Sequence, residues 1–319
     1  MSSNKGVIKI NTGIALFVYN RPKHTKKVLN GLKENNIDKL YIFADGIKKE
    51  EHKEAVNKVR NIIDSINWCE TEIIKNDRNK GLADSIVDGV NYVLDRNKRI
   101  IVLEDDCLPS ANFISFMEKC FDKYENNEKV MNITGYSLPI DIPSDYQYDI
   151  YFSYRSSSWG WGTWRRAWKK FNRDKSILEE INKSSNLKRK VNEAGEDLIP
   201  MLKKQIKGEI DSWAVYWSLN IIKNDGICIN PVKSKIKNIG HDGSGVHCGY
   251  NERYNINLKK EDIKDLKLPN DIIINDKIIA RYKEFFSPNW KDKIKRIGVK
   301  ATKMLGMYNF LKKLKDDLL

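Results

Sequence analysis

Three adjacent carboxylates are the feature of this 319-residue chain that most directly suggests chemistry. Glu104, Asp105 and Asp106, called the acidic triplet below, follow the apolar run at residues 99–103. Neighbouring negative charges repel one another, and a folded chain tolerates them only where a positive or hydrogen-bonding group compensates. A divalent cation does this, and carboxylate oxygens suit Mg²⁺ or Mn²⁺. The triplet therefore indicates a cation site, with a solvated acidic turn as the alternative.

The first third of the chain alternates strand and helix patterns that would position the triplet. Strands are predicted at residues 13–19, 39–44, 71–74 and 99–103, and helices at 24–35, 50–66 and 81–94. Continuous apolar strands between helices predict an α/β fold with a doubly wound, mostly parallel central sheet flanked by helices. Ligands of such sheets bind beyond the carboxyl ends of the strands. Charged residues follow all four predicted strands, so this edge is the expected ligand site.

The rest of the chain shows no repeat and no low-complexity linker. Helices are predicted at residues 113–126, 178–207 and 212–223, a strand at 130–135, a polar loop at 139–149 and a glycine-rich loop at 238–249. One catalytic domain over residues 1–250 with a C-terminal extension over 251–319 is the simplest interpretation.

The composition limits the partners and the compartment. A formal net charge of +14 favours an anionic partner, such as nucleic acid, a phosphorylated small molecule or an anionic membrane surface. The five cysteines are scattered without a Cys-x-x-Cys pair, which is typical of reduced thiols and gives no zinc or disulfide framework. No run resembles a signal peptide or a transmembrane helix, so a cytoplasmic protein is expected.

Five short motifs in order along the chain carry a resemblance to a known family. They are Asn20-Arg21-Pro22, Asp45-Gly46, residues 76–82, the acidic triplet and the stretch from Pro109 to Phe113. Together they resemble the nucleotide-sugar-binding domain of GT-A glycosyltransferases, over residues 12–250. The chain is similar to bacterial family 2-like sugar transferases related to the N-acetylglucosaminyltransferase I type. The resemblance implies a nucleotide-sugar half at about 12–110 and an acceptor half at about 111–250.

The resemblance also implies roles for the strand-end residues. Arg21 and Asp45 would contact the nucleobase end, Arg78 and Lys80 would approach the base or the diphosphate, Glu104 and Asp105 would bind the ribose or donor sugar side, and Asp106 would be the metal ligand. The implied cofactors are Mn²⁺ or Mg²⁺, with a nucleotide-diphosphate sugar as donor and UDP favoured. As alternatives, Arg21 is a surface residue after a turn and Asp45-Gly46 is only a turn.

An aromatic block supplies the predicted acceptor side. Trp159, Trp161 and Trp164 alternate with glycines, and a flat indole face suits a sugar ring. The block resembles the acceptor-side loop of the same transferases. The alternative is that these indoles fill the core.

Asp211 is the predicted catalytic base. The resembling family has a base at the equivalent place before a tryptophan, and an inverting transferase needs one carboxylate to deprotonate the acceptor hydroxyl. Glu209 is the second choice. Alternatively, Asp211 caps the helix that it precedes.

Two further segments complete the predicted site. The loop at residues 238–249 is expected to act as a lid, from which His247 or His241 would reach the metal or the diphosphate, unless both are simply solvated. Residues 290–319 form a basic amphipathic pattern that suits an anionic membrane surface. Packing on its own domain or on a second copy in a homodimer is the alternative for this tail.

The predicted function is a metal-dependent, inverting glycosyltransferase that moves a sugar to a hydroxyl of a glycan, glycolipid or glycoprotein acceptor in surface polysaccharide synthesis. It would lie in the cytoplasm, peripherally on the inner face of the membrane if the tail binds lipid. A sugar nucleotidyltransferase would need a glycine-rich phosphate loop where Asn20-Arg21-Pro22 stands. A nucleic-acid-binding module would leave the triplet unexplained, so nucleic acid is not expected as a partner. A catalytically silent glycan-binding or nucleotide-binding protein is the remaining alternative.

Overall fold

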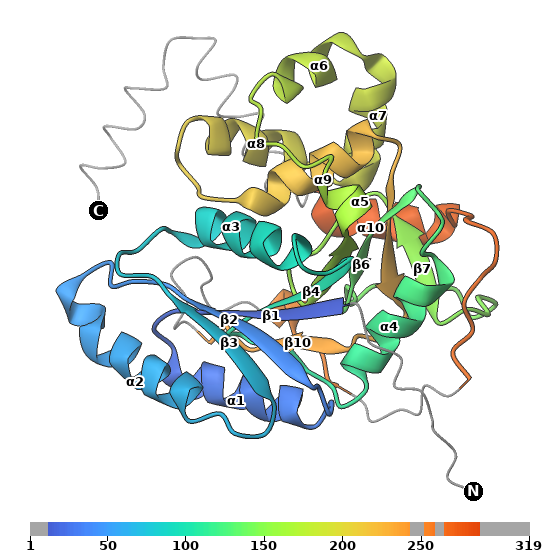
Figure 1. Cartoon of the computed structure of the whole chain (residues 1–319). Helices are drawn as coiled ribbons and strands as arrows, with labels where there is room; N and C mark the ends of the chain where they lie inside the picture. The colour runs from blue at the N-terminus through green and yellow to red at the C-terminus, as the bar shows by residue number, and fades with distance from the viewer. Residues whose placement is uncertain (1–11, 243–251, 259–264, 288–319) are drawn as a thin grey trace, which may run out of the picture.

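A central eight-stranded sheet organises the protein (Figure 1). The computed structural model describes residues 12–242, 252–258 and 265–287. The strand order is β3-β2-β1-β4-β8-β6-β9-β7. The strands are β1 (Thr12–Val18), β2 (Lys39–Ala44), β3 (Glu70–Lys75), β4 (Arg99–Glu104), β6 (Val130–Thr134), β7 (Ile150–Ser153), β8 (Trp161–Trp164) and β9 (Ile227–Pro231). A separate two-stranded sheet pairs β5 (Cys107–Pro109) with β10 (Ile236–Asn238).

The first four strands form a continuous parallel unit. β1 pairs with β2 and β4, and β2 pairs with β3, all in parallel. Antiparallel pairs enter where β8 lies between β4 and β6 and where β7 pairs with β9, while β6 and β9 are parallel. The predicted α/β fold with a mostly parallel central sheet is confirmed.

Helices cover both faces of this sheet (Figure 1). α1 (Pro22–Lys33), α2 (Lys53–Asp64) and α4 (Phe113–Lys123) cover one face, whereas α3 (Leu82–Leu94), α5 (Arg165–Trp168) and α9 (Trp213–Lys223) cover the other. α6 (Ile177–Lys183), α7 (Ser185–Ala194) and α8 (Leu198–Ile206) form a further cluster with α9. The remaining elements are α10 (Asp276–Phe286) and the short 3-10 helices η1 (Glu50–His52) and η2 (Glu252–Tyr254).

The continuous apolar strands of the sequence follow from this two-sided cover. In β1, Leu16 packs into the core on the α1 side and Phe17 into the core on the α3 side. Successive side chains of a strand point to opposite faces, so a strand covered on both faces is apolar along most of its length.

One predicted helix is divided in the structure. The long helix expected at residues 178–207 is divided into α6, α7 and α8. Ser184 ends α6 and caps α7, because its hydroxyl accepts a hydrogen bond from the Leu187 N–H at 3.2 Å. Gly195, with φ of +142°, then ends α7, since this backbone conformation is accessible mainly to glycine.

The described part of the C-terminal region belongs to the same body as the acceptor half. The Tyr136 hydroxyl donates to the Tyr254 carbonyl at 2.9 Å, and the Tyr124 hydroxyl donates to the Pro269 carbonyl at 2.8 Å. Tyr282 of α10 is 2 % exposed in the core of the α1 side. The described part of the predicted C-terminal extension at residues 251–319 therefore packs on the domain, and the boundary at residue 250 stays a prediction. The predicted basic helix at residues 290–319 lies outside the described residues.

Two sequence expectations concern the cysteines and the membrane. Cys69, Cys107, Cys120 and Cys228 are all free thiols. Among the described residues, no helix combines the length and the apolar character that a membrane span requires.

Candidate functional site

The acidic triplet lies where β4 ends, beside a residue from the end of β1. Arg21, which follows β1, donates from Nη2 to Asp106 Oδ2 at 3.0 Å and also pairs with Asp105 Oδ1. β1 and β4 are parallel neighbours, so their carboxyl ends deliver these charged groups to the same edge. Arg21 therefore lies with the acidic triplet, as the strand-end charges predicted. The alternative, that Arg21 is a free surface residue, is wrong.

The triplet carries more negative charge than its surroundings neutralise. Burial, followed by repulsion from Asp106 and Asp105, raises the pKa of Glu104 to about 8. Burial also raises the pKa of Asp105 to about 6, even though Arg21 opposes this shift. One guanidinium therefore offsets three carboxylates incompletely, which is the electrostatic condition that a bound cation relieves.

The donor chemistry fits a hard cation that is shared with a substrate. Asp106 offers carboxylate oxygens at the edge of the site, with its side chain 13 % exposed. Among the residues that the structure describes, no group of three His, Cys, Asp or Glu side chains converges as a complete metal cage. Mg²⁺ commonly binds to one or two carboxylates and completes its shell with phosphate and water oxygens. Asp106 fits that mode of binding.

The segment after β10 packs directly on Asp106. The Ile239 N–H donates to the Asp106 carbonyl at 2.8 Å. A Cβ at Gly240 would lie 2.4 Å from Asp106 Oδ2, so only a glycine allows this approach. The Cys107 thiol donates to Asp106 Oδ1 at 3.5 Å from another side. His247, the other predicted metal ligand, lies outside the described residues.

Asp45 holds the loop that follows β3. Its carboxylate accepts hydrogen bonds from the backbone N–H groups of Gly46 (2.9 Å), Lys80 (3.0 Å) and Gly81 (3.2 Å), and from the side-chain amides of Asn76 (3.3 Å) and Asn79 (2.8 Å). With five protein donors and 9 % exposure, this carboxylate positions the loop at residues 76–81. Its interpretation as only a turn is wrong, and its predicted contact with a nucleobase stays a prediction.

The two cations predicted in this loop lie at the surface. The Lys80 ammonium pairs with Asp88 on α3 at 2.8 Å. The Arg78 backbone packs on Gly46, where a Cβ would lie 2.3 Å from the Arg78 carbonyl carbon. Arg78 is exposed, so its side chain is accessible to a ligand at this edge.

Asp211 reaches the same edge from the other half of the chain. Its Oδ2 accepts a hydrogen bond from the Ala83 N–H, in the first turn of α3, at 3.3 Å. The residue that precedes its own helix α9 is Ser212, so Asp211 does not cap that helix. A carboxylate at the N-terminus of α3 is favoured by the helix dipole. Glu209 instead lies near Lys207 at 3.8 Å, with its side chain 51 % exposed.

The three predicted acceptor tryptophans separate into different environments. Trp161 is completely buried among Trp168, Trp213 and Trp217. Trp164, 1 % exposed, packs on the opposite face of the sheet. Both indoles fill the core, so the prediction that they contact an acceptor is corrected: β8 is an interior strand with both faces covered. For Trp159, the acceptor role stays a prediction.

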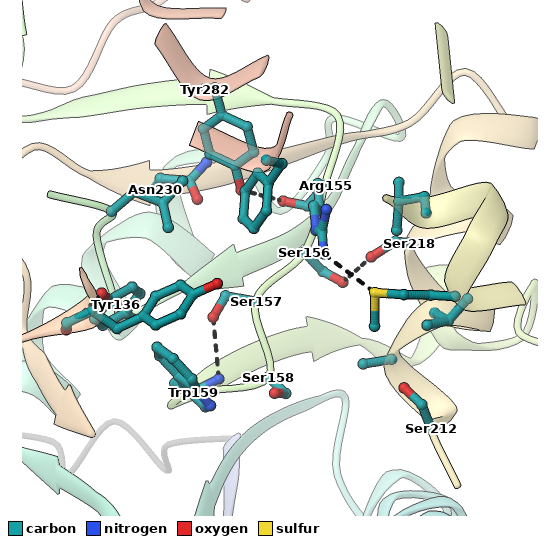
Figure 2. Close-up of a pocket in the computed structure, with 17 residues that line it drawn as sticks. Tyr136, Arg155, Ser156, Ser157, Ser158, Trp159, Ser212, Ser218, Asn230 and Tyr282 are labelled. Carbon is teal, nitrogen blue, oxygen red and sulfur yellow. Dashed lines mark hydrogen bonds between the residues drawn. The ribbon is translucent and has the colours of Figure 1, made fainter. Parts of the chain in front are cut away.

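Trp159 lines a cavity of about 240 Å³, together with Ser212 (Figure 2). The lining combines aromatic rings with small hydroxyl groups, including those of Ser156, Ser157, Ser158, Ser212 and Ser218. Ser212 comes directly after Asp211 and links the cavity to the predicted base. The Ser156 and Ser218 hydroxyls bond to each other at 2.9 Å. Aromatic faces with a few hydroxyls suit an uncharged sugar ring.

The one charged residue of this lining is internally neutralised. Arg155 makes a two-point contact with Asp197, at 2.6 and 3.0 Å, and its guanidinium stacks over Phe286 at 3.8 Å. The cavity therefore presents no free charge from Arg155 to a ligand.

Several cavity residues were missed by the sequence analysis. Tyr136, Asn230, Tyr254 and Tyr282 come from segments that are far apart in the chain. Aromatic residues after residue 250 were the available signal, but no local spacing links them to Trp159.

Comparisons with known proteins give distant structural likenesses. No protein-family model and no curated protein matches the chain. Solved structures similar to it include TarS from S. aureus, with 10 % identity over 70 % of this chain and 59 % of that one and a TM-score of 0.39. A mannosyltransferase from Pyrobaculum calidifontis, solved with GDP-Man and Mn²⁺, has 9 % identity, covers 67 % and 73 % of the two chains and gives a TM-score of 0.37.

A third likeness is to 4-diphosphocytidyl-2C-methyl-D-erythritol synthase from Anaerococcus prevotii. It has 8 % identity, covers 71 % of this chain and 90 % of that one, and gives a TM-score of 0.36. The chain spans less than two thirds of the TarS structure. Likenesses at this level do not establish an activity, so the function is inferred below from the site itself.

Proposed function

We propose that this protein is a divalent-cation-dependent, inverting glycosyltransferase that uses a nucleotide-diphosphate sugar. The observation that carries the proposal is the largely buried acidic triplet at the carboxyl end of β4, which Arg21 neutralises only in part. A diphosphate with its cation fits both halves of that edge: the cation at Asp106, and the phosphate oxygens near the guanidinium.

The donor would be bound along the carboxyl ends of the first four strands. Arg21 would orient the diphosphate, and Asp105, held by Arg21, would accept a hydrogen bond from a ribose or sugar hydroxyl. Asp45 would act through the loop at residues 76–81, which it fixes with its hydrogen bonds. A cation at Asp106 would neutralise the charge that develops on the departing nucleoside diphosphate.

Asp211 would be the general base. Its carboxylate is exposed, sits at the first turn of α3 and adjoins the cavity through Ser212. The acceptor hydroxyl would lose its proton to Asp211 as its oxygen attacks the anomeric carbon. The bond from that carbon to the diphosphate oxygen breaks, and the nucleoside diphosphate leaves with the electron pair. A single displacement of this kind inverts the configuration and needs no second nucleophilic carboxylate.

The acceptor would enter through the cavity lined by Trp159. We further propose that UDP is the nucleotide of the donor and that the acceptor is a lipid-linked or protein-linked glycan in surface polysaccharide synthesis. Residues 290–319 would provide the membrane contact.

A donor panel tests the proposal. The protein is incubated with UDP-, GDP- and dTDP-sugars and Mn²⁺, with and without methyl pyranosides as acceptors, and the release of nucleoside diphosphate is measured. We expect release from one nucleotide class, at least as slow hydrolysis, and loss of release when EDTA removes the cation.

Two other outcomes would point to the alternatives. Formation of pyrophosphate from a nucleoside triphosphate and a sugar 1-phosphate, without nucleoside diphosphate release, would identify a nucleotidyltransferase. Binding of a nucleotide sugar without turnover under any condition would identify a binding protein.

A further inference from the structure

His241 occupies the junction between the acidic site and the cavity. Its ring stacks nearly parallel to Tyr254, with centroids 5.5 Å apart and planes 12° apart, and meets Trp159 edge-on at 5.2 Å. Trp159 and Tyr254 both line the cavity. The preceding residue, Gly240, packs on the carboxylate of Asp106. The imidazole therefore lies against two cavity-lining rings, on the residue that follows the glycine packed on the proposed metal ligand.

Both ring nitrogens of His241 are unpaired. Each is shielded from solvent and has no hydrogen-bond partner among the residues that the structure describes. A neutral imidazole carries one N–H donor and one acceptor nitrogen, and native proteins rarely bury such groups unpaired because the lost hydration is costly. A phenyl ring would stack equally well on Tyr254 without this cost. The nitrogens are therefore not required for packing, and a ligand is the partner that explains them.

The chemistry of the surroundings selects the group that the nitrogens would bind. A sugar hydroxyl both donates and accepts, so it matches either nitrogen of the ring, whereas an ionised phosphate can only accept. The aromatic flanks of Trp159 and Tyr254 favour a sugar ring over an ionic group. Arg155 of the nearby cavity is already neutralised by Asp197.

The position of Gly240 and His241 beside Asp106 favours the donor sugar over the acceptor sugar as the ligand. In a nucleotide-diphosphate sugar, the sugar is bonded directly to the terminal phosphate. If the diphosphate and its cation bind at Asp106, that sugar must lie next to the cation site. Consecutive Cα atoms are about 3.8 Å apart, so the backbone of His241 lies next to that of Gly240, which packs on Asp106.

We propose that His241 binds the donor sugar through a hydroxyl group and so contributes to the choice of sugar. This assignment rests on the proposed function. The sugar would reach the edge of the imidazole by displacing the side chains that shield it. The residue would recognise the sugar of the donor and not its nucleotide.

The test compares two ligands that differ only in the sugar. Binding of the nucleoside diphosphate and of its sugar derivative is measured by calorimetry with Mn²⁺, using the nucleotide class that the donor panel selects, for the wild-type protein and for His241→Phe. We expect His241→Phe to weaken the nucleotide sugar about tenfold and to leave the nucleoside diphosphate unchanged. His241→Gln, which restores a donor and an acceptor, should recover part of the loss.

Thermal melting tests the premise separately. Because phenylalanine removes two unpaired nitrogens and keeps the ring, His241→Phe should melt at the wild-type temperature or above. A lower melting temperature would show that the nitrogens are paired and would overturn the assignment. Equal affinity of wild-type and His241→Phe protein for the nucleotide sugar would overturn it while leaving the proposed function intact. Failure of the wild-type protein to bind any nucleotide would instead refute the proposed function, and this assignment with it.

Discussion

The two ends of strand β4 carry two acidic clusters of the same composition. At the carboxyl end, the acidic triplet meets Arg21. At the amino end, Glu118, Asp122 and Glu125 surround Arg99, with contacts of 3.5, 2.6 and 2.8 Å. Each cluster has three carboxylates and one arginine, so a count of charges does not distinguish them.

Hydration and additional partners distinguish the two clusters. The side chains of Glu118, Asp122 and Glu125 are 20 %, 69 % and 34 % exposed, whereas those of Asp105 and Asp106 are 5 % and 13 % exposed. Glu118 also accepts from Thr12, and Glu125 from the Trp164 indole. Asp122 and Glu125 are therefore largely hydrated, and Glu118 meets Arg99 and Thr12, although its Oε1 is buried without a hydrogen-bond partner. The carboxyl-end cluster is further removed from water, and one arginine compensates its charge only in part. The carboxyl-end cluster is therefore the one whose charge a bound cation would compensate.

The largest expected effect separates the two ends directly. Asp106→Asn should lower nucleoside diphosphate release by at least about 10³-fold, because a cation at this carboxylate would contribute several kcal/mol to the stabilisation of the leaving group. Asp122→Asn is the matched control at the amino end and should retain close to wild-type turnover. Similar losses in both variants would contradict a functional difference between the clusters.

The second prediction concerns Asp211, the proposed general base near the carboxyl ends of the strands. Asp211→Asn should lower the turnover number by about 10²- to 10³-fold with little change in donor affinity, as expected for loss of a general base. Glu209→Gln, two residues away and exposed, should have little effect. If Glu209→Gln is the more damaging variant in a steady-state assay, the base has been assigned to the wrong carboxylate.

The third effect is the pH dependence of stability in the metal-free protein. Glu104 has a pKa of about 8 in the folded protein and an ordinary value of 4.5, so between these values the folded state holds more protons than the unfolded chain. Rising pH therefore destabilises the fold across this window, and the loss is complete above pH 8. Glu104→Gln should remove this penalty and raise the free energy of unfolding at pH 8 by about 4 kcal/mol, because each tenfold change in the protonation equilibrium corresponds to about 1.4 kcal/mol.

Urea unfolding from pH 5 to pH 9 with EDTA measures this dependence. Glu118→Gln provides the comparison: burial also raises the pKa of Glu118, but its pairing with Arg99 and Thr12 opposes the shift. The stabilisation should be smaller there. If Glu118→Gln raised the free energy of unfolding more than Glu104→Gln does, the less compensated charge would lie at the amino end of β4, contrary to this interpretation.

The smallest expected effect on activity comes from Trp159, and Trp164 near the amino end of β4 provides the comparison. Trp159→Ala should raise the acceptor KM roughly five- to tenfold, because stacking with a sugar ring is worth about 1 kcal/mol. Trp164→Phe should leave KM unchanged but lower the free energy of unfolding by about 1–2 kcal/mol, since the Trp164 indole donates to Glu125 at 3.1 Å. Calorimetric melting and acceptor titrations separate the two outcomes, and an unchanged KM in Trp159→Ala would remove that residue from the acceptor site.

The parallel half of the fold could be predicted because its signals are local. Residues 99–103 read as a strand from their continuous apolar character, and β4 is observed at Arg99–Glu104. Once the parallel sheet is recognised, the common edge of Arg21 and the triplet follows from topology.

The rest depends on contacts that no local pattern encodes. Asp211 meets Ala83 across 128 positions of the chain, and Asp45 binds a loop more than 30 residues away. Trp161 is buried and Trp159 lines the cavity because β8, which begins at Trp161, is inserted between β4 and β6. Gly160, with φ of +59°, reverses the local backbone between these two indoles, so alternation with glycine did not reveal which of them would be buried.

The central claim is that the acidic triplet at the carboxyl end of β4 binds a cation together with a nucleoside diphosphate. Calorimetric titration of Mn²⁺ into the wild-type protein, Asp106→Asn and Asp122→Asn, each with and without UDP or GDP, tests it most directly. We expect saturable Mn²⁺ binding that the nucleotide strengthens in the wild-type protein and in Asp122→Asn, and its loss in Asp106→Asn. Equal Mn²⁺ binding by Asp106→Asn and the wild-type protein in the presence of the nucleotide would contradict it.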